Sequence, residues 1–150
     1  MNTKLVEQLK RHEGFSENFY LCAAGKKTIG YGRNVASNPK FNGKIITEPM
    51  SRKTAEQILI YDIGTAISAL NKGWPYFVGM EDTPRKDVCI NMTFNLGIGG
   101  FMKFKKLHEA IRNKKWDVAA EEMNSSAWYD QVGDRSIELV QQMRTGKYIG

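Results

Sequence analysis

The stretch HEGFSENFYLCAAGKKTIGYG, residues 12–32, decides how the N-terminal part of this chain folds. A helix is predicted over about residues 3–11, and Gly14 is the kind of residue that ends a helix. Glu13 is thereby left at the helix end, where a side chain can face a cleft. The segments FYLC and TIGYG flank a turn at Gly25, and their aromatic and β-branched residues predict a β-hairpin.

Two glycines in the second strand of this hairpin are unusual for a strand interior. Gly30 and Gly32 mark a bulge or the close approach of another backbone or a ligand. A third short strand is predicted at KII, residues 44–46. The predicted strands therefore cluster between residues 18 and 46.

The rest of the chain has the periodicity of helices. After Ser51, a candidate N-cap, apolar residues recur every three to four positions, which predicts a helix of about five turns ending before Gly73. Everything from Arg85 onward is predicted helical, with Val88, Met92 and Leu96 on one face of the first of these helices. Shorter helices are predicted near residues 106–112 and 116–123, and a last one from Asp134, carrying Ile137, Val140 and Met143.

Segregated strands and helices define an α+β protein rather than alternating βαβ units. We expect one domain over residues 1–150, in which a small β-rich lobe and a larger helical lobe leave a substrate cleft between them. The expected parts are a β-rich lobe at residues 12–50, a connecting helix at 51–73 and a helical lobe made of 1–11 and 74–150. Trp116, Trp128 and Cys89 are expected to pack in the helical lobe.

Composition limits the possible partners and compartments. The formal net charge of +6 favours anionic partners such as nucleic acid, anionic lipid or an acidic wall polymer. It is equally open that the charge only keeps the protein soluble and has no specific partner. Two cysteines do not make a disulfide framework and suit a reducing compartment. The N-terminus lacks the pattern of a signal peptide, and no apolar run approaches the roughly 18 residues of a membrane span. We therefore expect a soluble protein made without its own export signal.

A basic patch stands out in the second half of the chain. Two interpretations of this patch are equally open: it attracts an anionic wall or membrane surface, or it is only a solvated face of the protein. The patch consists of Lys103, Lys105, Lys106, Arg112, Lys114 and Lys115.

The spacing Glu13, eight residues, Cys22, five residues, Thr28 closely resembles the signature of the phage lysozyme (endolysin) family, of the T-even phage type. In that family of glycoside hydrolases the middle position is aspartate, or sometimes cysteine. Further segments resemble the family in the same order along the chain. They are INMTFNLGIGGF (90–101), KKWDVAAEEM (114–123), SAWYDQ (126–131), DR (134–135) and RTGKY (144–148).

The resemblance implies a muramidase that hydrolyses the β-1,4 bond between N-acetylmuramic acid and N-acetylglucosamine in peptidoglycan. Glu13 would protonate the leaving oxygen, which requires a pKa above the free value of about 4.3. Cys22 would activate the water, although an ordinary thiol is only a few per cent thiolate at pH 7. Lys26, Lys27 and the net positive charge are expected to lower its pKa. Attack on the sugar by the thiolate, or a bystander role in packing, remain alternatives for Cys22.

Other roles rest on the same resemblance. Thr28 would hold the water or the sugar, and Arg135 would position Glu13 as its charged partner. Asn34 and Phe94 fall on positions that line the saccharide groove. Leu107 and Glu122 align with that groove more loosely.

The family's usual arrangement implies accumulation in the host cytoplasm until a pore protein, a holin, releases the enzyme to the wall and the host cell lyses. We expect a monomer without cofactor, nucleic-acid partner or stable membrane insertion. No metal is expected, because His12 and His108 have no ligand-like cluster around them. Two rivals stay open: a lytic transglycosylase, which needs one glutamate and no base, and a basic binding protein without catalysis.

Overall fold

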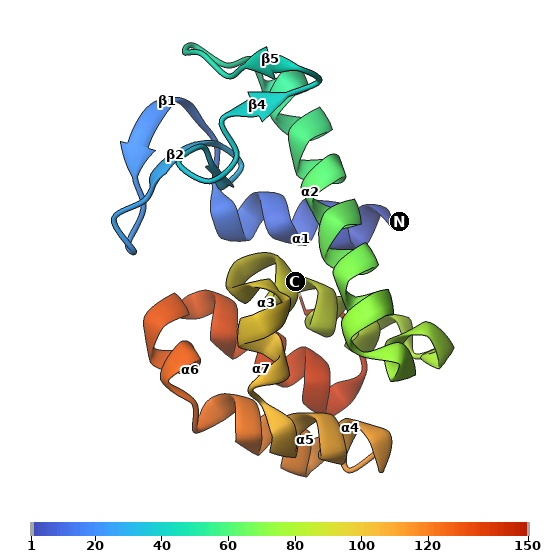
Figure 1. Cartoon of the computed structure of the whole chain (residues 1–150). Coiled ribbons are helices and arrows are strands. Elements are labelled where there is room, and N and C mark those ends of the chain that lie inside the picture. Colours follow the sequence, from blue (N-terminus) through green and yellow to red (C-terminus); the bar gives the residue numbers. More distant parts are fainter. Residues whose placement is uncertain (1, 150) are drawn as a thin grey trace. The chain divides into compact units, whose positions relative to one another are not determined.

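The first and last elements of the described chain are helices, and all the strands fall between residues 16 and 45, which confirms the α+β class (Figure 1). The structure is a computed structural model that describes residues 2–149, without the side chains of residues 127, 130 and 131. The helices are α1 (Thr3–Glu13), α2 (Arg52–Gly73), the 3-10 helix η1 (Pro75–Gly79), α3 (Thr83–Met102), α4 (Lys105–Arg112), α5 (Trp116–Asn124), α6 (Ala127–Val132) and α7 (Asp134–Thr145). The strands are β1 (Ser16–Leu21), β2 (Lys27–Gly30), β3 (Arg33–Asn34), β4 (Lys40–Phe41) and β5 (Lys44–Ile45).

The chain divides into two compact units, an N-terminal unit that ends at Gly64 and a C-terminal unit that begins at Thr65. Helix α2 contributes residues to both. The lobes expected from the sequence combine residues 1–11 with 74–150, which belong to different units, so that division stays a prediction.

Helix α1 begins and ends as its sequence indicates. Asn2 caps it, with its side-chain oxygen accepting a hydrogen bond from the Leu5 amide at 2.9 Å. Leu5 and Leu9 are buried on its inner face. The helix extends to Glu13, two residues beyond the predicted end, because the chain turns only at Gly14, whose amide donates to the Lys10 carbonyl at 2.9 Å.

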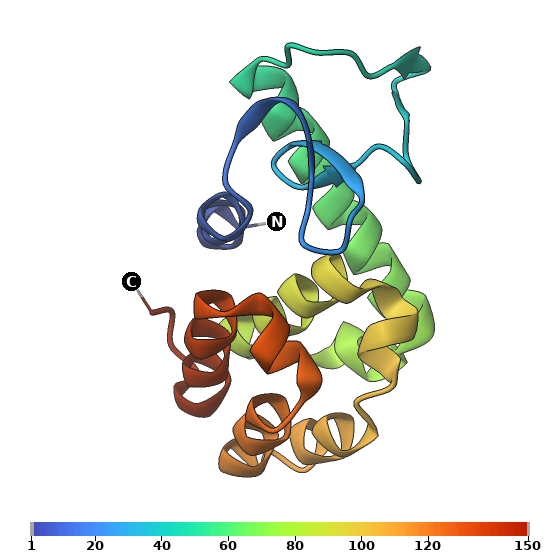
Figure 2. The ribbon, with the colours of Figure 1, turned by 90° about the vertical axis from the view of Figure 1, so that its left-hand side faces the viewer.

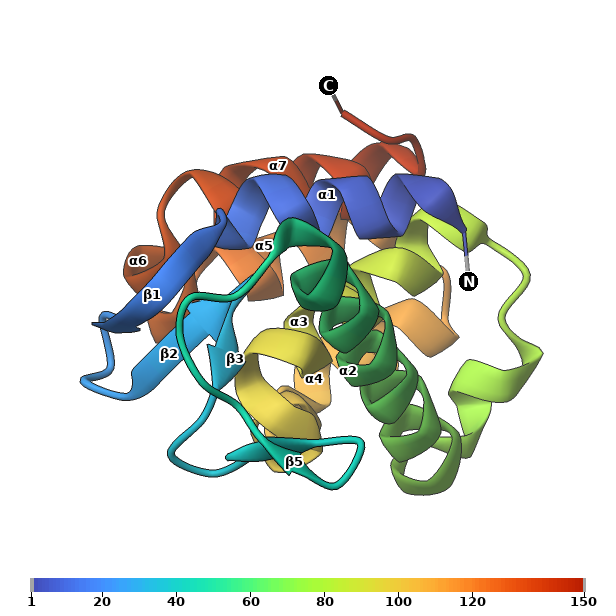
Figure 3. The same ribbon diagram turned by 90° about the horizontal axis from the view of Figure 1, so that it is seen from above.

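The predicted hairpin is confirmed. Strands β1 and β2 pair in antiparallel register, with Tyr20 opposite Thr28 and Leu21 opposite Lys27. Strand β3 adds to the other edge of β2, so that β2 lies in the middle of a three-stranded sheet. Figure 3 shows β2 between β1 and β3.

The predicted strand at residues 44–46 forms, but in a second sheet. Strand β5 pairs with β4, and not with the first hairpin, in a two-stranded sheet closed by Asn42 and Gly43. Both turn residues have positive φ, 52° and 76°, as a type I′ hairpin turn requires. An Asn-Gly pair suits this turn because both residues tolerate the left-handed region.

Helix α2 starts where the sequence indicates. The Ser51 hydroxyl accepts a hydrogen bond from the Thr54 amide at 3.1 Å, which confirms Ser51 as the N-cap. Its buried positions follow the helical period, and they are Ala55, Ile58, Leu59, Ile63, Ala66 and Leu70.

The C-terminal unit is a cluster of helices around its own core. Cys89 and Trp128 are buried there as expected, and the Trp128 indole donates to the Asn95 side chain at 3.1 Å. Val88 and Met92 are fully buried, whereas Ile137 is 52% exposed. Helix α3 bends at Gly97, whose backbone is not helical. Figure 2 shows the last four helices following α3 within this unit.

Candidate functional site

Glu13 lies against the glycine that the sequence singled out. A Cβ atom added at Gly32 would stand 2.5 Å from the Glu13 Oε2 atom and 2.8 Å from its carboxyl carbon. Real Cβ atoms essentially never come this close, so only glycine leaves the half-buried carboxylate in place. The close approach predicted at Gly32 is therefore made by the side chain of Glu13. At Gly30, Met50 and Ala55 make the close approach.

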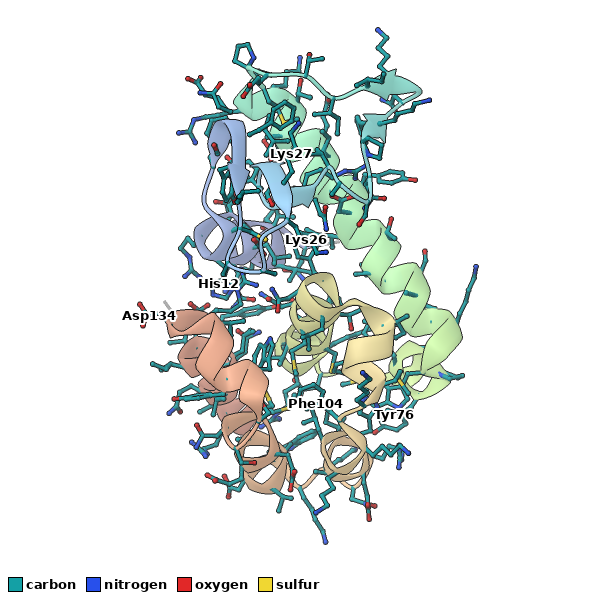
Figure 4. The ribbon with its side chains drawn as sticks, turned by 60° about the vertical axis from the view of Figure 1, so that its left-hand side comes forward. His12, Lys26, Lys27, Tyr76, Phe104 and Asp134 are labelled. Carbon is teal, nitrogen blue, oxygen red and sulfur yellow. The ribbon has the colours of Figure 1, made fainter. Side chains whose placement is uncertain are left out.

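Helix α1 is anchored in the N-terminal unit close to Glu13. The Lys10 ammonium lies 3.2 Å from a Glu56 carboxylate oxygen on α2 and 3.5 Å from Glu7. Figure 4 labels His12 at the end of α1, and Lys26 and Lys27 at the hairpin, within the same unit. The Lys10–Glu56 ion pair thus links α1, which ends at Glu13, to α2.

Cys22 sits at the start of a tight turn. Its amide donates to the Lys26 carbonyl at 3.0 Å, and its carbonyl accepts from the Gly25 amide at 2.8 Å. The thiol is free and half-buried. Hydrogen bonds from the Lys26 and Ala24 backbone and the Thr28 side chain, with the Lys26 bond the largest cause, lower the pKa of Cys22 against the opposing effect of burial.

The direction of the Cys22 pKa shift agrees with the expectation, but its cause does not. The positive side chains of Lys26 and Lys27 were expected to lower the pKa, whereas backbone amides and a hydroxyl do so. The physical reason is proximity: a turn aims its amides at the side chain that opens it, whereas the Lys27 ammonium lies over the Phe19 ring, 4.2 Å from its centre.

Thr28 is buried beside this thiol. Its hydroxyl donates to the Lys26 carbonyl at 2.7 Å, and its side chain also interacts with the Cys22 sulfur. A hydroxyl has one proton to donate. When Cys22 is a thiol, Thr28 keeps its bond to Lys26. When Cys22 is a thiolate, the same proton can turn toward sulfur and stabilise the negative charge.

A row of side chains crosses the sheet at this level. Tyr20 is opposite Thr28, and Thr28 is opposite Asn34, so all three share one face. Phe19 and Lys27 lie on the other face, where the Lys27 ammonium stands 4.2 Å from the Phe19 ring centre. Predicted residues Thr28 and Asn34 are therefore brought together in the N-terminal unit with Cys22.

Sequence reasoning missed Tyr20. The pKa of the Tyr20 phenol is raised, chiefly by burial and further by the charges of Glu13 and Cys22. The phenol therefore lies within electrostatic range of both groups and stays protonated, as a hydrogen-bond donor, at neutral pH. The signal in the sequence was the two-residue period of a strand, which places residues 20 and 22 on one face.

The remaining predicted residues belong to the C-terminal unit. Phe94 is half-buried on α3, and Arg135 is buried in the first turn of α7. Leu107 is 1% exposed and packs in the core of that unit, and Glu122 is half-buried on α5. Pairing of Arg135 with Glu13, and a groove lined by Phe94, would join the two units and stay predictions.

The described residues contain no group of three or more histidine, cysteine, aspartate or glutamate side chains placed to hold a metal ion. His108 is buried, with its Nε2 atom 2.9 Å from the Phe101 carbonyl. Among residues 2–149, no helix is both long and apolar enough to cross a membrane.

The small antiparallel sheets and the many helices form an α+β, lysozyme-like fold. Residues 10–145 match the family model described as Phage lysozyme. The chain belongs to the phage lysozyme family and is a glycoside hydrolase that acts on peptidoglycan.

Alignments with individual relatives cover nearly the whole chain. Probable T4-type lysozyme 1 and Probable T4-type lysozyme 2 of Dictyostelium discoideum are 27% and 28% identical to it. Each alignment covers 97% of this chain and 96% of the relative. Pre-baseplate central spike protein Gp5 of Enterobacteria phage T4 is 24% identical, over 97% of this chain and 28% of that protein.

Proposed function

We propose that this lysozyme hydrolyses the β-1,4 bond between N-acetylmuramic acid and N-acetylglucosamine, with Glu13 as the acid and Cys22 as the base. The observation that carries this proposal is the turn around Cys22, whose amides lower the pKa of the thiol. A thiolate there can do the work that aspartate does in most of the family. Membership of a lysozyme family also argues against the rival of a basic binding protein without catalysis.

The proposed reaction has two coupled proton movements. The Glu13 carboxyl gives its proton to the glycosidic oxygen, and the bond from that oxygen to the sugar C1 atom breaks. Water attacks C1 and gives a proton to the Cys22 thiolate, which becomes a thiol. An inverting enzyme of this kind needs roughly 6.5–9.5 Å between acid and base, to leave room for the water.

Thr28 and Tyr20 have supporting roles in this scheme. The Thr28 hydroxyl turns its hydrogen bond from the Lys26 carbonyl to the Cys22 thiolate and keeps its proton. The Thr28 oxygen accepts a hydrogen bond from the attacking water. Tyr20, protonated on the same face, donates a hydrogen bond to the sugar. Asn34 extends the row for a neighbouring sugar hydroxyl. Phe94 and Arg135 are proposed to complete the groove and to position Glu13.

Two sets of variants test the assignment. Replacing Glu13 with Gln removes the proton donor and is expected to abolish lysis of purified walls, and full activity would overturn the proposal. Replacing Cys22 with Ala is expected to abolish activity, and replacing it with Asp is expected to restore it. Full activity in Cys22→Ala would make Cys22 a spectator. Loss in both, with unchanged circular dichroism, would favour a covalent nucleophile.

The missing carboxylate at position 22 also favours one rival reaction. A lytic transglycosylase closes an anhydro ring with the sugar's own hydroxyl and needs no base. Mass spectrometry of digested peptidoglycan separates the two reactions. Reducing ends are expected for hydrolysis, and anhydro ends would show transglycosylation.

We further propose that the protein is a monomeric endolysin that accumulates in a host cytoplasm and lyses the host after a holin opens the membrane. The family description and the similarity to a phage T4 protein support this role, and the Dictyostelium relatives leave other settings open. Bacteria expressing the chain alone are expected to stay intact and to lyse when their inner membrane is permeabilised. Lysis without permeabilisation would overturn the holin requirement, and sedimentation would show the oligomeric state.

A further inference from the structure

The proposed proton donor is joined to the sheet by a glycine. Glu13 is the last residue of α1, and Gly14 connects it to the segment that enters β1. Figure 3 shows α1 leading straight into β1, which lies beside β2. Gly14 has φ of 68°, and in the described chain no atom outside its two neighbours lies within 4 Å of a Cβ built there. Because glycine has the most backbone freedom, the place of the Glu13 carboxyl depends on what holds the chain on either side of Gly14.

Phe15 holds the chain after this glycine. Its ring lies against the ring of Tyr31, with 5.5 Å between the ring centres and 54° between the ring planes. Strand pairing brings the two rings together, because Ser16 is opposite Gly30 and the rings belong to the next residues at this end of the hairpin. Tyr31 is buried and Phe15 is half-buried, and aromatic pairs at such a separation attract each other beyond the burial of their surface.

The same two segments of the chain also meet at the carboxylate. Gly32 directly follows Tyr31, and a Cβ atom at Gly32 would stand 2.5 Å from the Glu13 Oε2 atom. The ring contact is therefore two residues after Glu13 on one segment and one residue before Gly32 on the other. A shift of the Tyr31 ring would move both the backbone that carries Glu13 and the wall against which its carboxylate lies.

Each of the two rings has a cation over it. The Arg52 guanidinium carbon lies 4.4 Å from the centre of the Phe15 ring, and the Lys10 ammonium lies 5.7 Å from the centre of the Tyr31 ring. Both distances are within the roughly 6 Å over which a cation is attracted to an aromatic face. Lys10 belongs to α1, three residues before Glu13, and Arg52 is the first residue of α2.

Helix α2 closes this series of contacts. The Lys10 ammonium pairs with the Glu56 carboxylate at 3.2 Å. Arg52 and Glu56 are four residues apart in α2, so they are neighbours on the helix surface. We call the five side chains in this closed series the aromatic clamp, and they are Glu56, Lys10, Tyr31, Phe15 and Arg52.

The aromatic clamp holds both ends of the segment that carries Glu13. Lys10 fixes the last turn of α1 before it, and Phe15 fixes the chain after Gly14. Tyr31 contacts both of these residues, so it is the member of the clamp that joins the two ends.

The position of a proton donor has a large effect on rate. The donor oxygen must come within about 2.6–3.2 Å of the oxygen that it protonates. A misplacement of about 1 Å, caused far from the chemistry, can lower a rate on the order of a hundredfold. A side chain that makes no contact with the sugar can therefore control catalysis by fixing the segment of the acid.

We propose that Tyr31 is a positioning residue for the reaction, which holds the Glu13 carboxyl in place through Phe15 and Gly32. This inference rests on the proposed function, in which Glu13 is the acid. Tyr31 acts through its ring, so a phenylalanine at this position is expected to do the same work.

A leaving group that needs no proton separates positioning of the acid from general damage. Two oligosaccharides of the same glycan are compared, one with a sugar as leaving group and one with 2,4-dinitrophenolate, which leaves as a stable anion. Tyr31→Leu is expected to lower kcat about tenfold on the first substrate, with KM within about twofold, and to change kcat by less than about twofold on the second. Tyr31→Phe keeps the ring and is expected to retain kcat on both.

Tyr61→Leu is the matched control. Tyr61 of α2 is another tyrosine of the N-terminal unit whose ring meets a phenylalanine, since 5.6 Å separates its ring centre from that of Phe41 in β4. It lies outside the aromatic clamp, and its variant is expected to behave as wild type on both substrates. Phe15→Leu removes the other ring of the clamp and is expected to show the same selective loss, so it decides the question if Tyr31→Leu does not fold.

The outcomes for the clamp and for the acid are separate. Equal losses on both substrates in a folded Tyr31→Leu or Phe15→Leu protein would show that the rings only support the fold. Unchanged kcat on the sugar leaving group would show that Glu13 does not depend on them, and either result overturns the inference. Glu13→Gln tests the proposed function, because it is expected to lose activity on the sugar leaving group and to keep it on dinitrophenolate. Equal losses in Glu13→Gln would overturn the role of Glu13 as the acid.

Discussion

At the scale of the residue, the two cysteines are expected to react very differently. Hydrogen bonds in the turn lower the pKa of Cys22, whereas burial raises the pKa of Cys89, so that only Cys22 has an accessible thiolate. In a Cys89→Ser variant, the rate of alkylation by iodoacetamide should follow the fraction of Cys22 thiolate, and its midpoint pH should lie below that of an ordinary cysteine thiol. The rate of alkylation, measured by mass spectrometry between pH 5 and 10, checks this.

The matched variant is Cys22→Ser, in which the buried Cys89 should stay unmodified while the protein is folded. Thr28→Val removes the hydroxyl that stabilises the thiolate and should move the midpoint of Cys22 alkylation to higher pH. A midpoint at or above the usual thiol value in the Cys89→Ser protein would contradict the role given to the turn. Alkylation of Cys22 should also stop the enzyme if this thiol takes part in the reaction.

His108 makes a second prediction at this scale, for stability against pH. Burial lowers the pKa of His108, and its Nδ1 atom is buried with no partner among the described residues. The unfolded chain takes up a proton near pH 6.5 that the folded chain resists. Stability is therefore complete above about pH 6.5 and falls as the pH drops below it, by at most about 1.4 kcal/mol per pH unit.

Urea unfolding at pH 7.5 and pH 5 measures this effect. His108→Gln, which keeps a donor for the Phe101 carbonyl, should lose less stability between these two values than the wild type, even if it is less stable at both. An equal loss in the two proteins would show that other groups cause the acid destabilisation.

At the scale of the element, the end of α7 depends on Gly146. Its backbone is left-handed, with φ of 70°, and a Cβ atom there would stand 2.7 Å from the Arg85 Nη1 atom. Arg85 caps α7 by donating to the Met143 and Arg144 carbonyls, and it also pairs with Asp82. Gly146→Ala should cost about 1–3 kcal/mol of unfolding free energy, through backbone strain and displacement of Arg85.

Gly64→Ala is the control for this variant. Gly64 lies inside α2 with no atom within 4 Å of an added Cβ, so alanine should be neutral or stabilise by up to about 1 kcal/mol. Denaturant midpoints of the two variants check the comparison. Equal stability of the Gly146→Ala protein and the wild type would mean that the Arg85 cap contributes little.

The sequence predicted the long elements and the short strand at residues 44–46, and it missed strands β3 and β4. The periodicity of α2 and the aromatic hairpin extended over enough residues to be recognised, and the Ser51 cap and Gly14 marked their limits. Strands β3 and β4 have two residues each, too few to show a period, and the hydrogen bond that links them, from the Arg33 side chain to the Lys40 carbonyl, is a tertiary contact. Helix α6 lies in the region predicted helical from Arg85 onward, but the sequence did not define its limits, and η1 was not predicted.

The same limit explains what was missed at the site. The spacing of Glu13, Cys22 and Thr28 was visible because a family pattern exists for it. The role of Tyr20 was not visible in the sequence. It follows from the register of the strands, which the pairing of Tyr20 with Thr28 shows. The cause of the lowered Cys22 pKa depends on backbone amides, which the side chains in a sequence do not reveal.

At the scale of the whole molecule, the net charge of +6 should act on the encounter with the wall. The six residues of the basic patch at 103–115 are all exposed, so their field extends into solvent over about 8 Å at physiological ionic strength. Salt should therefore slow the digestion of intact, anionic walls by reducing the association rate. Digestion of short, peptide-free glycan strands should depend little on salt.

Neutralising the patch tests whether its position matters. A Lys105→Gln, Lys106→Gln double variant should weaken the salt dependence on walls, while a Lys4→Gln, Lys53→Gln double variant controls for the same loss of net charge outside the patch. Initial rates of turbidity loss between 20 and 300 mM salt measure the effect. If both double variants reduce the salt dependence equally, only the total charge matters and the patch is a solvated face. If wild-type rates do not change with salt, charge has no part in wall association.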